Sequence, residues 1–298
     1  MAKYKGTANQ QSIPDASHIA RCALDPRVMQ SKKYKLVPAK KKKNIAVIGG
    51  GIGGMEAALV CCKRGHKVTL YEKSDKLGGV FIAAAAPSYK EKDRDLIAWY
   101  NREIRKYSDI TVKLNTEIKD VNSLGADEVI VATGAVANRI PVKGANEYGI
   151  QAVEYLLEEK PVGDKVVIVG GGLTGCEIAY DLFLKGKTPV IVEMQHDLIV
   201  SDKICLANTS YLRDFFAAKN VEVHLEAKTT EIRADGVTIA TKDGKTLDIA
   251  ADSVILSVGY KPAPLAPEGK HIHIVGDASK VGSLRTVIWQ AWDVAMKL

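Results

Sequence analysis

Apolar and polar positions follow two patterns along this chain: short apolar runs typical of buried strands, and longer stretches with helical spacing. The apolar run at residues 45–48 ends on glycines, a helical pattern follows, and a second run at residues 68–71 ends on Glu72. Residues 91–107 also have the spacing of an amphipathic helix. Strands that alternate with helices predict an α/β fold built on a parallel sheet.

A glycine-rich turn joins the first predicted strand to the first predicted helix. Gly49, Gly51 and Gly54 have the spacing G-x-G-x-x-G. In this motif the first glycine permits a tight turn, the second lets a pyrophosphate approach the backbone, and the third lets the helix pack on the strand. The phosphates then bind N–H groups at the helix N-terminus. Glu72, 21 residues beyond Gly51, can accept from a ribose hydroxyl. A glycine-rich turn that binds nothing is the alternative, and this ordered set argues against it.

The same pattern occurs again 121 residues later. Gly170, Gly172 and Gly175 repeat the turn, and Glu193 repeats the acid at the end of the second strand. One constant offset indicates a duplicated unit, so the chain is predicted to bind two dinucleotides. A carboxylate at Glu193 would repel the 2′-phosphate of NADPH, which predicts a preference for NADH at the second site.

The second half of the chain adds a different pattern. Asp-Gly turns at 235–236 and 243–244 separate β-rich runs and predict a meander of antiparallel strands. Residues 198–220 are predicted to be mostly helical, and residues 284–297 to form a last helix. Between them, a short strand at 273–275 leads into Gly276 and Asp277.

This last strand decides the predicted domain organisation, because it needs a sheet to join and the first unit lacks its final strand. We therefore assign residues 44–150 and 260–298 to one domain, and residues 151–259 to a second domain inserted in it. The predicted fold is α/β, with two Rossmann-like dinucleotide-binding domains that combine parallel sheets with an antiparallel meander. Residues 1–43 are predicted to be a basic arm.

Charge and composition narrow the function classes. The 298 residues carry a net charge of +7, but residues 1–43 hold eleven Lys or Arg and two Asp, a net +9, which leaves −2 for the rest. A basic arm could meet nucleic acid or an acidic partner; a solvated tail is the preferred interpretation, so no nucleic-acid partner is predicted. No apolar run reaches the ~20 residues that span a bilayer, and no secretory signal opens the chain, so no membrane association is expected.

Cysteine and histidine positions suggest no further chemistry. The five cysteines form no C-x-x-C pair, which suits a reducing cytoplasm and argues against a redox-active disulfide. The six histidines form no cluster, so no metal site is predicted.

Together these motifs resemble the two-dinucleotide-binding flavoprotein fold of pyridine nucleotide–disulfide reductases. The resemblance rests on the two glycine turns, Leu77-Gly78-Gly79, Ala132-Thr133-Gly134, Ser257-Val258-Gly259 and Gly276-Asp277, and it covers residues 44–298. It implies that the first domain holds FAD and the inserted domain holds NAD(H).

The resemblance also implies roles for individual residues. Glu72 would bind the FAD ribose, Gly79 and Val80 would lie along the pyrophosphate, Asp277 would accept from the ribityl chain, and the helix beginning near Thr286 would point at the flavin. The implied FAD-binding residues are Gly49, Gly51, Gly53, Gly54, Glu72, Lys73, Gly79, Val80, Ala132, Thr133, Gly134, Gly276, Asp277 and Thr286. The implied NAD(H)-binding residues are Gly170, Gly172, Thr174, Gly175, Glu193, Val258 and Gly259. Taken alone, Thr133-Gly134 could be a strand-end turn and Asp277 a helix N-cap.

A closer similarity is to the FAD/NAD(H) part of 2,4-dienoyl-CoA reductase, 2-enoate reductase and trimethylamine dehydrogenase, carried by residues 21–26 (RCALDP). In those long enzymes a TIM barrel with FMN and a [4Fe–4S] cluster come first. Taking Cys22 as the last cluster ligand places the other three at Lys3, Gly6 and Gln10, so this chain alone is predicted to hold no cluster.

Two function classes follow. The first is an FAD-dependent NADH oxidoreductase that passes electrons to an unknown acceptor, such as an FMN-containing TIM-barrel subunit or domain. No catalytic side chain is expected, because the cofactors carry the hydride transfer. The second is a module that binds ADP or FAD without hydride transfer, as the equivalent region of trimethylamine dehydrogenase does with ADP. Two intact glycine turns favour the enzyme.

Overall fold

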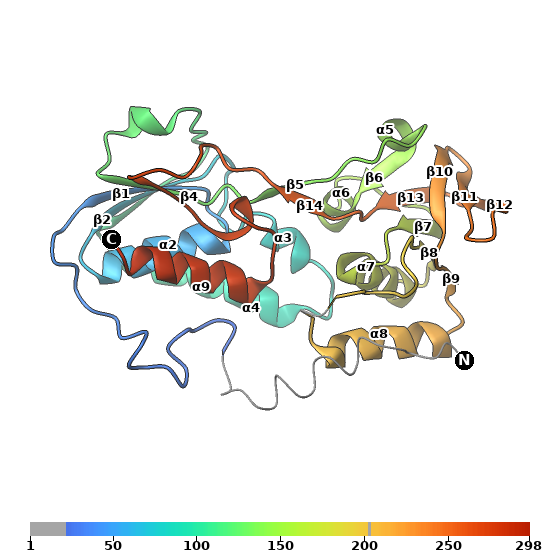
Figure 1. The fold of residues 1–298 in the computed structure, drawn as a ribbon, viewed down its shortest axis with the longest axis horizontal. Helices are drawn as coiled ribbons and strands as arrows, with labels where there is room; N and C mark the ends of the chain where they lie inside the picture. The colour runs from blue at the N-terminus through green and yellow to red at the C-terminus, as the bar shows by residue number, and fades with distance from the viewer. Residues whose placement is uncertain (1–21, 202–203) are drawn as a thin grey trace. The chain divides into compact units, whose positions relative to one another are not determined.

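The computed structural model describes residues 22–201 and 204–298, which divide into two compact units (Figure 1). The first unit comprises residues 22–85, 90–136 and 260–298. The second comprises residues 86–89 and the described part of 137–259. The arm upstream of residue 22, with the three positions that would carry the other cluster ligands, lies outside the described residues.

The first unit is built on a five-stranded parallel sheet in the order β15-β4-β1-β2-β3. Its strands are β1 (Asn44–Ile48), β2 (Lys67–Tyr71), β3 (Ile110–Lys113), β4 (Glu128–Val131) and β15 (Ile272–Ile274). The predicted last strand therefore joins the first sheet, beside β4, although about 140 residues separate the two strands in the chain.

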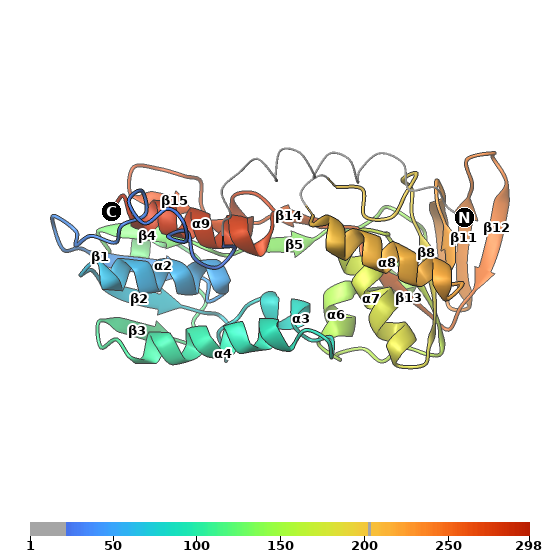
Figure 2. The same ribbon diagram turned by 90° about the horizontal axis from the view of Figure 1, so that it is seen from below.

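Alternate residues of β1 serve two cores, as the period of a strand requires. Ile45 and Val47 pack against the helices, and Ala46 and Ile48 face a smaller cluster around Val121. The helices α2 and α9 lie side by side along the sheet, with α4 next to α2 (Figures 1 and 2). The helical segments of this unit are α2 (Ile52–Lys63), α3 (Phe81–Ala84), α4 (Glu91–Arg105), α9 (Leu284–Ala295) and the short 3₁₀ turns η1 (Val121–Leu124) and η2 (Gly276–Ala278).

The second unit repeats this plan with a sheet in the order β6-β13-β7-β8-β9, again all parallel. Its strands are β6 (Gly149–Gln151), β7 (Lys165–Val169), β8 (Thr188–Val192), β9 (Glu222–His224) and β13 (Ser253–Leu256). Its helices are α5 (Ala145–Tyr148), α6 (Ala152–Leu156), α7 (Leu173–Leu184) and α8 (Leu206–Ala218). Valines and isoleucines fill β7 and β8, as expected for strands that are buried on both faces.

The two faces of this second sheet are covered differently. Val166 and Ile168 point to a core shared with α7 and α8. Val167 and Val169 point to a core shared with the predicted meander, which the structure contains as an antiparallel sheet. The meander strands are β10 (Lys228–Arg233), β11 (Gly236–Ala240) and β12 (Thr246–Ala250).

Three features differ from expectation. Residues 137–150, which the sequence-based boundary placed in the first domain, cluster with the second unit, because the three-residue strand β6 pairs with β13. The helix predicted from residue 198 begins only at Leu206. Where the chain passes between units, β5 (Ala135–Ala137) and β14 (Tyr260–Pro262) form a two-stranded sheet that no motif predicts. Among the described residues, no helix is long and apolar enough to cross a bilayer.

Candidate dinucleotide-binding sites

The first glycine turn lies between the end of β1 and the start of α2. Gly49 has φ +105°, and a Cβ there would lie 2.4 Å from the Ala132 carbonyl oxygen. A Cβ on Gly54 would lie 1.9 Å from the Gly49 oxygen. These two positions therefore require glycine for the packing of the protein itself.

Gly51 differs, because no contact with the described residues requires it to be glycine. Its φ of −70° and ψ of −179° suit any residue, and a Cβ would meet no described atom within 4 Å. It is the N-cap of α2, and it has no side chain to satisfy the N–H groups of the first turn. An open space in front of unsatisfied N–H groups at a helix N-terminus fits a pyrophosphate.

The second glycine turn repeats this geometry between β7 and α7. Gly170 has φ +108°, and a Cβ on Gly175 would lie 1.9 Å from the Gly170 oxygen. Gly172 has φ −68° and ψ 179°, and a Cβ there would also meet no described atom within 4 Å. The 121-residue repeat in the sequence is thus a repeat of two glycine turns with the same backbone geometry and with open space at the helix N-cap.

The two acids bridge their glycine turns in the same way. Glu72 is buried and accepts from the N–H of Gly50 at 2.6 Å and from that of Ser74 at 2.8 Å. Glu193 accepts from the N–H of Gly171 at 2.5 Å and from that of Gln195 at 2.8 Å. Each carboxylate therefore fixes the end of its strand against the glycine turn, an arrangement that also suits a ribose hydroxyl beside it.

The strand-end segments after β4 and β13 form the other wall of each turn. The Ala132 carbonyl faces Gly49, and the Ser257 carbonyl faces Gly170 in the same manner. Gly134 and Gly259 follow with φ of +74° and +83°. The Thr133 hydroxyl donates to the Ala263 carbonyl at 2.7 Å, and the Val258 carbonyl accepts from the Asn138 amide at 3.2 Å. These residues form strand-end turns in both units. They also lie beside the glycine turn, as their predicted role in dinucleotide binding requires.

The segment after Glu72 runs back along the first glycine turn. The N–H of Gly78 donates to the Gly50 carbonyl at 2.8 Å, and a Cβ on Gly79 would lie 3.0 Å from the Gly51 Cα. Val80 is 49% exposed, and Lys73 is exposed at the strand end. Gly79 is therefore beside the open space at Gly51, as its predicted role requires.

The start of α9 is organised by Ser283 rather than Asp277. The Ser283 hydroxyl accepts from the N–H of Thr286, and the Thr286 hydroxyl accepts from the N–H of Ser283 at 2.8 Å. The idea that Asp277 caps this helix is therefore wrong. Asp277 instead follows Gly276 (φ +65°) and accepts from the N–H of Gly282 at 3.0 Å, and burial raises the pKa of its carboxyl.

The first turns of α2 and α7 contain the remaining predicted residues. Gly53 is buried, and a Cβ there would lie 3.0 Å from the Val287 side chain, so α9 packs directly on this turn. Thr174, its counterpart in α7, is half-buried.

All five cysteines are free thiols in the structure. Burial raises the pKa of Cys61 to about 12 and also raises that of Cys176, which makes both poor nucleophiles. In the part of the chain that the structure describes, no three His, Cys, Asp or Glu side chains come together as a metal site.

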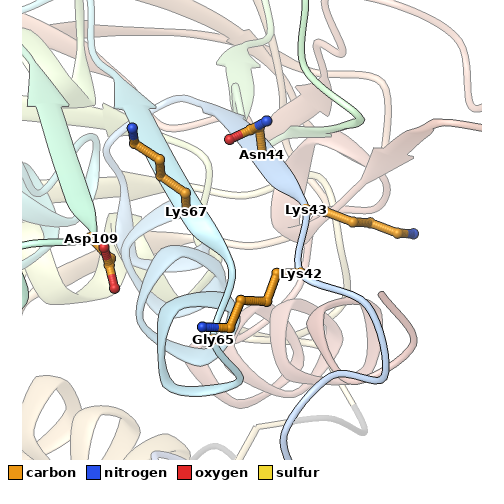
Figure 3. Close-up of a pocket in the computed structure, with 6 residues that line it drawn as sticks. All are labelled: Lys42, Lys43, Asn44, Gly65, Lys67 and Asp109. Carbon is orange, nitrogen blue, oxygen red and sulfur yellow. The ribbon is translucent and has the colours of Figure 1, made fainter.

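A small basic pocket of about 190 Å³ lies at the opposite end of the first sheet from the glycine turn (Figure 3). It is lined by Lys42, Lys43, Asn44, Gly65, Lys67 and Asp109. Asn44 and Lys67 begin β1 and β2, whereas the glycine turn follows the end of β1. Ligands of parallel α/β sheets bind at the carboxyl ends of the strands, so this pocket is not the dinucleotide site.

Next to this pocket, Glu128 interacts with three basic side chains. Its carboxylate lies 2.7 Å from Lys43, 3.0 Å from His273 and 3.4 Å from His271. Burial raises the pKa of Glu128, but the hydrogen bonds from these partners outweigh it and lower the pKa to about 2.

A comparison with protein families matches residues 43–277 to the pyridine nucleotide-disulphide oxidoreductase domain. The chain belongs to the pyridine nucleotide-disulphide oxidoreductase family. The match spans both glycine turns and most of both units. It confirms the predicted fold class.

Relatives of this oxidoreductase include reductases and an oxidase. It is 37% identical to cinnamate reductase of Clostridium sporogenes over 93% of its own length and 42% of the relative's. It is 32% identical to NADH oxidase of Thermoanaerobacter brockii, over 93% of its own length and 44% of the relative's. A solved structure of 2-naphthoyl-CoA reductase with 2-naphthoyl-CoA superposes with a TM-score of 0.85 at 28% identity, covering 95% of this chain and 44% of the other.

These similarities confirm the predicted class of enzyme, an FAD-dependent oxidoreductase that uses NAD(H), and the predicted resemblance to the FAD/NAD(H) part of longer reductases. The chain spans less than half the length of these relatives.

Sequence reasoning missed three residues that support the glycine turns. Ser74 and Gln195 hydrogen-bond to the two acids, and Leu198 packs on the second turn as Leu77 of the Leu77-Gly78-Gly79 motif packs on the first. The 121-residue offset relates Leu77 to Leu198, so Leu198 could have been found by continuing the repeat past Glu193. Arg213, which holds the loop around Leu198, has no counterpart in any motif.

Proposed function

We propose that this chain takes a hydride from NADH in its second unit, delivers it to FAD in its first unit, and passes the electrons on to a separate acceptor. When bound, FAD supplies the redox chemistry: it accepts a hydride and a proton and later gives up two electrons. The contribution of the protein is to bind and orient both dinucleotides.

The observation that carries this proposal is the matched geometry of the two glycine turns. Gly51 and Gly172 are both helix N-caps with extended backbone and open space, and each has its own bridging carboxylate. A module that binds one nucleotide for structural purposes would need only one such site. Two intact sites support binding of both partners of a hydride transfer.

The individual binding roles are part of the proposal. In the first unit, the glycine turn, Glu72, Gly79 and Asp277 would bind FAD, with Thr286 in the first turn of a helix that favours negative charge near its N-terminus. In the second unit, the turn at Gly172 together with Glu193 would bind the adenosine half of NADH.

For the acceptor, we propose an FMN-bearing ene-reductase module. The support is the resemblance to the family of long reductases together with the similarity to cinnamate reductase, which the chain matches over less than half of that relative's length. The reaction passes reducing equivalents to an acceptor that is not among the groups bound by these two units.

The test is to identify what the purified protein binds and then to titrate it anaerobically with NADH. We expect about one FAD per chain and complete bleaching of the flavin at one equivalent of NADH. A colourless protein from which ADP is extracted would contradict the proposal and support a binding module instead. Addition of an FMN-bearing ene-reductase domain should then restore the oxidised FAD spectrum.

A further inference from the structure

In the second unit, the loop after Glu193 folds back over the glycine turn. The N–H of Ile199 donates to the Gly171 carbonyl at 2.8 Å. Leu198 packs on the same residue, since a Cβ on Gly171 would lie 2.6 Å from its side chain. Residues 197–200 therefore pack against the glycine turn next to Gly172.

The first unit makes the same contact at the same offset. The N–H of Gly78 donates to the Gly50 carbonyl at 2.8 Å, and a Cβ on Gly50 would lie 2.5 Å from the Leu77 side chain. Adding 121 to Leu77 and Gly78 gives Leu198 and Ile199. The duplicated unit thus includes this returning loop, and both loops have the same place against their glycine turns.

The backbone conformation shows where the two loops differ. Gly78 has φ +133°, which glycine adopts without cost. Ile199 has φ +51°, in the left-handed region that a β-branched residue rarely enters. Its side chain is buried, so the loop cannot relax by turning it into solvent. Such strain persists only where the surroundings hold the residue in place.

Arg213, on α8, holds Ile199 in this conformation. Its Nε donates to the Leu198 carbonyl at 3.0 Å, and its Nη2 donates to the carbonyls of Leu198 and Ile199, the latter at 3.3 Å. It also lies 3.3 Å from the Asp197 carboxylate, and its side chain is buried. The planar guanidinium can bind both carbonyls and the carboxylate together, which a lysine ammonium on a flexible stem does less well.

The residue at the corresponding position of the first unit, Lys92, pairs with a different partner. Lys92 stands at the same offset from Arg213, and it forms an exposed ion pair with Asp95 on its own helix. Gly78 adopts its positive φ without cost, so no arginine is needed to hold it. Arg213 and the strained Ile199 therefore belong together, and both are confined to the second unit.

We propose that Arg213 is a positioning residue for NAD(H) binding: it holds residues 197–200 in the strained conformation that supports the glycine turn beside Gly172. This inference rests on the proposed assignment of NAD(H) to the second unit. Arg213 acts through the loop and does not touch the reacting atoms. Its removal should therefore weaken binding of the dinucleotide and leave the hydride-transfer step unchanged.

The experiment compares Arg213→Met with Arg64→Met. Arg64 is also a buried arginine that donates to backbone carbonyls, those of Val37 and Ala295, but it lies in the first unit. Each purified protein is titrated with NAD⁺ by calorimetry, and reduction of its FAD by NADH is followed by stopped flow.

For Arg213→Met we expect the Kd of NAD⁺ to rise about tenfold, which corresponds to ~1.4 kcal/mol. The apparent Kd of NADH should rise in parallel, with an unchanged limiting rate constant and unchanged FAD content. Arg64→Met should bind NAD⁺ as the wild type does. Hydrogen exchange at the Ile199 amide should become faster in Arg213→Met alone.

Two outcomes would overturn the inference. The first is an Arg213→Met protein whose affinity for NAD⁺ stays within twofold of that of the wild type. If Arg213→Met does not fold, Arg213→Lys replaces it, and its affinity for NAD⁺ should fall at least threefold. The second outcome is an Arg213→Lys protein that binds NAD⁺ with wild-type affinity. Failure of the wild type itself to bind NAD⁺ would instead refute the proposed function.

Discussion

Gly51→Ala and Gly172→Ala form a matched pair of substitutions that should each empty one site and leave the other intact. At both positions the backbone suits alanine, and the added methyl group meets no described atom within 4 Å. The perturbation is thus directed at whatever occupies the open space, and the fold should tolerate it.

The expected cost to stability is small. Alanine is a poorer N-cap than glycine, which costs somewhat less than ~1 kcal/mol. Replacing glycine at an unstrained position also restricts the unfolded chain, which stabilises the folded protein by roughly 0.4–1 kcal/mol. The free energy of unfolding should therefore change by less than about 1 kcal/mol.

The expected cost to binding is much larger. A methyl group in the opening would keep a pyrophosphate away from the N–H groups of the first helical turn. Loss of two hydrogen bonds to a charged group, at roughly 1.5–3 kcal/mol each, gives roughly 3–6 kcal/mol. That range corresponds to an increase in Kd of about 10²- to 10⁴-fold.

The assay measures FAD content and FAD affinity of the apoprotein, together with NAD⁺ affinity by calorimetry. Gly51→Ala should lose FAD and keep NAD⁺ binding, and Gly172→Ala should do the reverse. Gly54→Ala is the contrasting control, because its Cβ would lie 1.9 Å from the Gly49 oxygen and should destabilise the fold itself. A Gly51→Ala protein that retains stoichiometric FAD with wild-type affinity would refute the assignment of this opening.

Three further outcomes are expected. FAD should be reduced faster by NADH than by NADPH at pH 8, and Glu193→Ala should narrow the gap; equal rates in the wild type would contradict the role of that carboxylate. Purified anaerobically, this chain alone should contain no [4Fe–4S] cluster despite Cys22, and near-stoichiometric iron and acid-labile sulfide would show otherwise. The pKa of Glu128 is lowered from 4.5 to about 2, so its contribution to stability, at most about 3 kcal/mol, is present above pH 4.5 and lost as the pH falls towards 2. Urea unfolding of Glu128→Gln should lack that pH dependence, and an unchanged dependence would contradict the assignment.

Much of the fold follows from local patterns that the chain repeats. The apolar runs at β1 and β7 are buried on both faces, and the glycine turns and acids come at fixed distances after them. The meander is signalled by two Asp-Gly turns. These features depend on residues close in sequence, and a single chain displays them directly.

The elements that could not be predicted depend on long-range contacts. β6 is three residues long and exists because β13 pairs with it. The start of α8 was predicted eight residues too early, because apolar Leu198 and Ile199 continue a helical pattern although Arg213 holds them in a loop. No local spacing reveals a guanidinium that reaches back fifteen and fourteen residues to the carbonyl groups of Leu198 and Ile199.

Some site residues could likewise be predicted from local motifs, and others depend on long-range contacts. Gly51 and Gly172 were predicted from the motif alone, and the structure adds that the space beside each is open. That Ser283 caps α9, and not Asp277, depends on the three-dimensional course of the loop between them.

The central claim is that the two units together move a hydride from NADH to FAD. It is tested most directly by mixing the anaerobic protein with NADH that is deuterated at C4 on one face or on the other, and following the flavin absorbance. We expect rapid bleaching that is slowed by deuterium on one face only, with that deuterium lost from the NAD⁺ formed. Flavin that stays oxidised in the presence of excess NADH would contradict the claim.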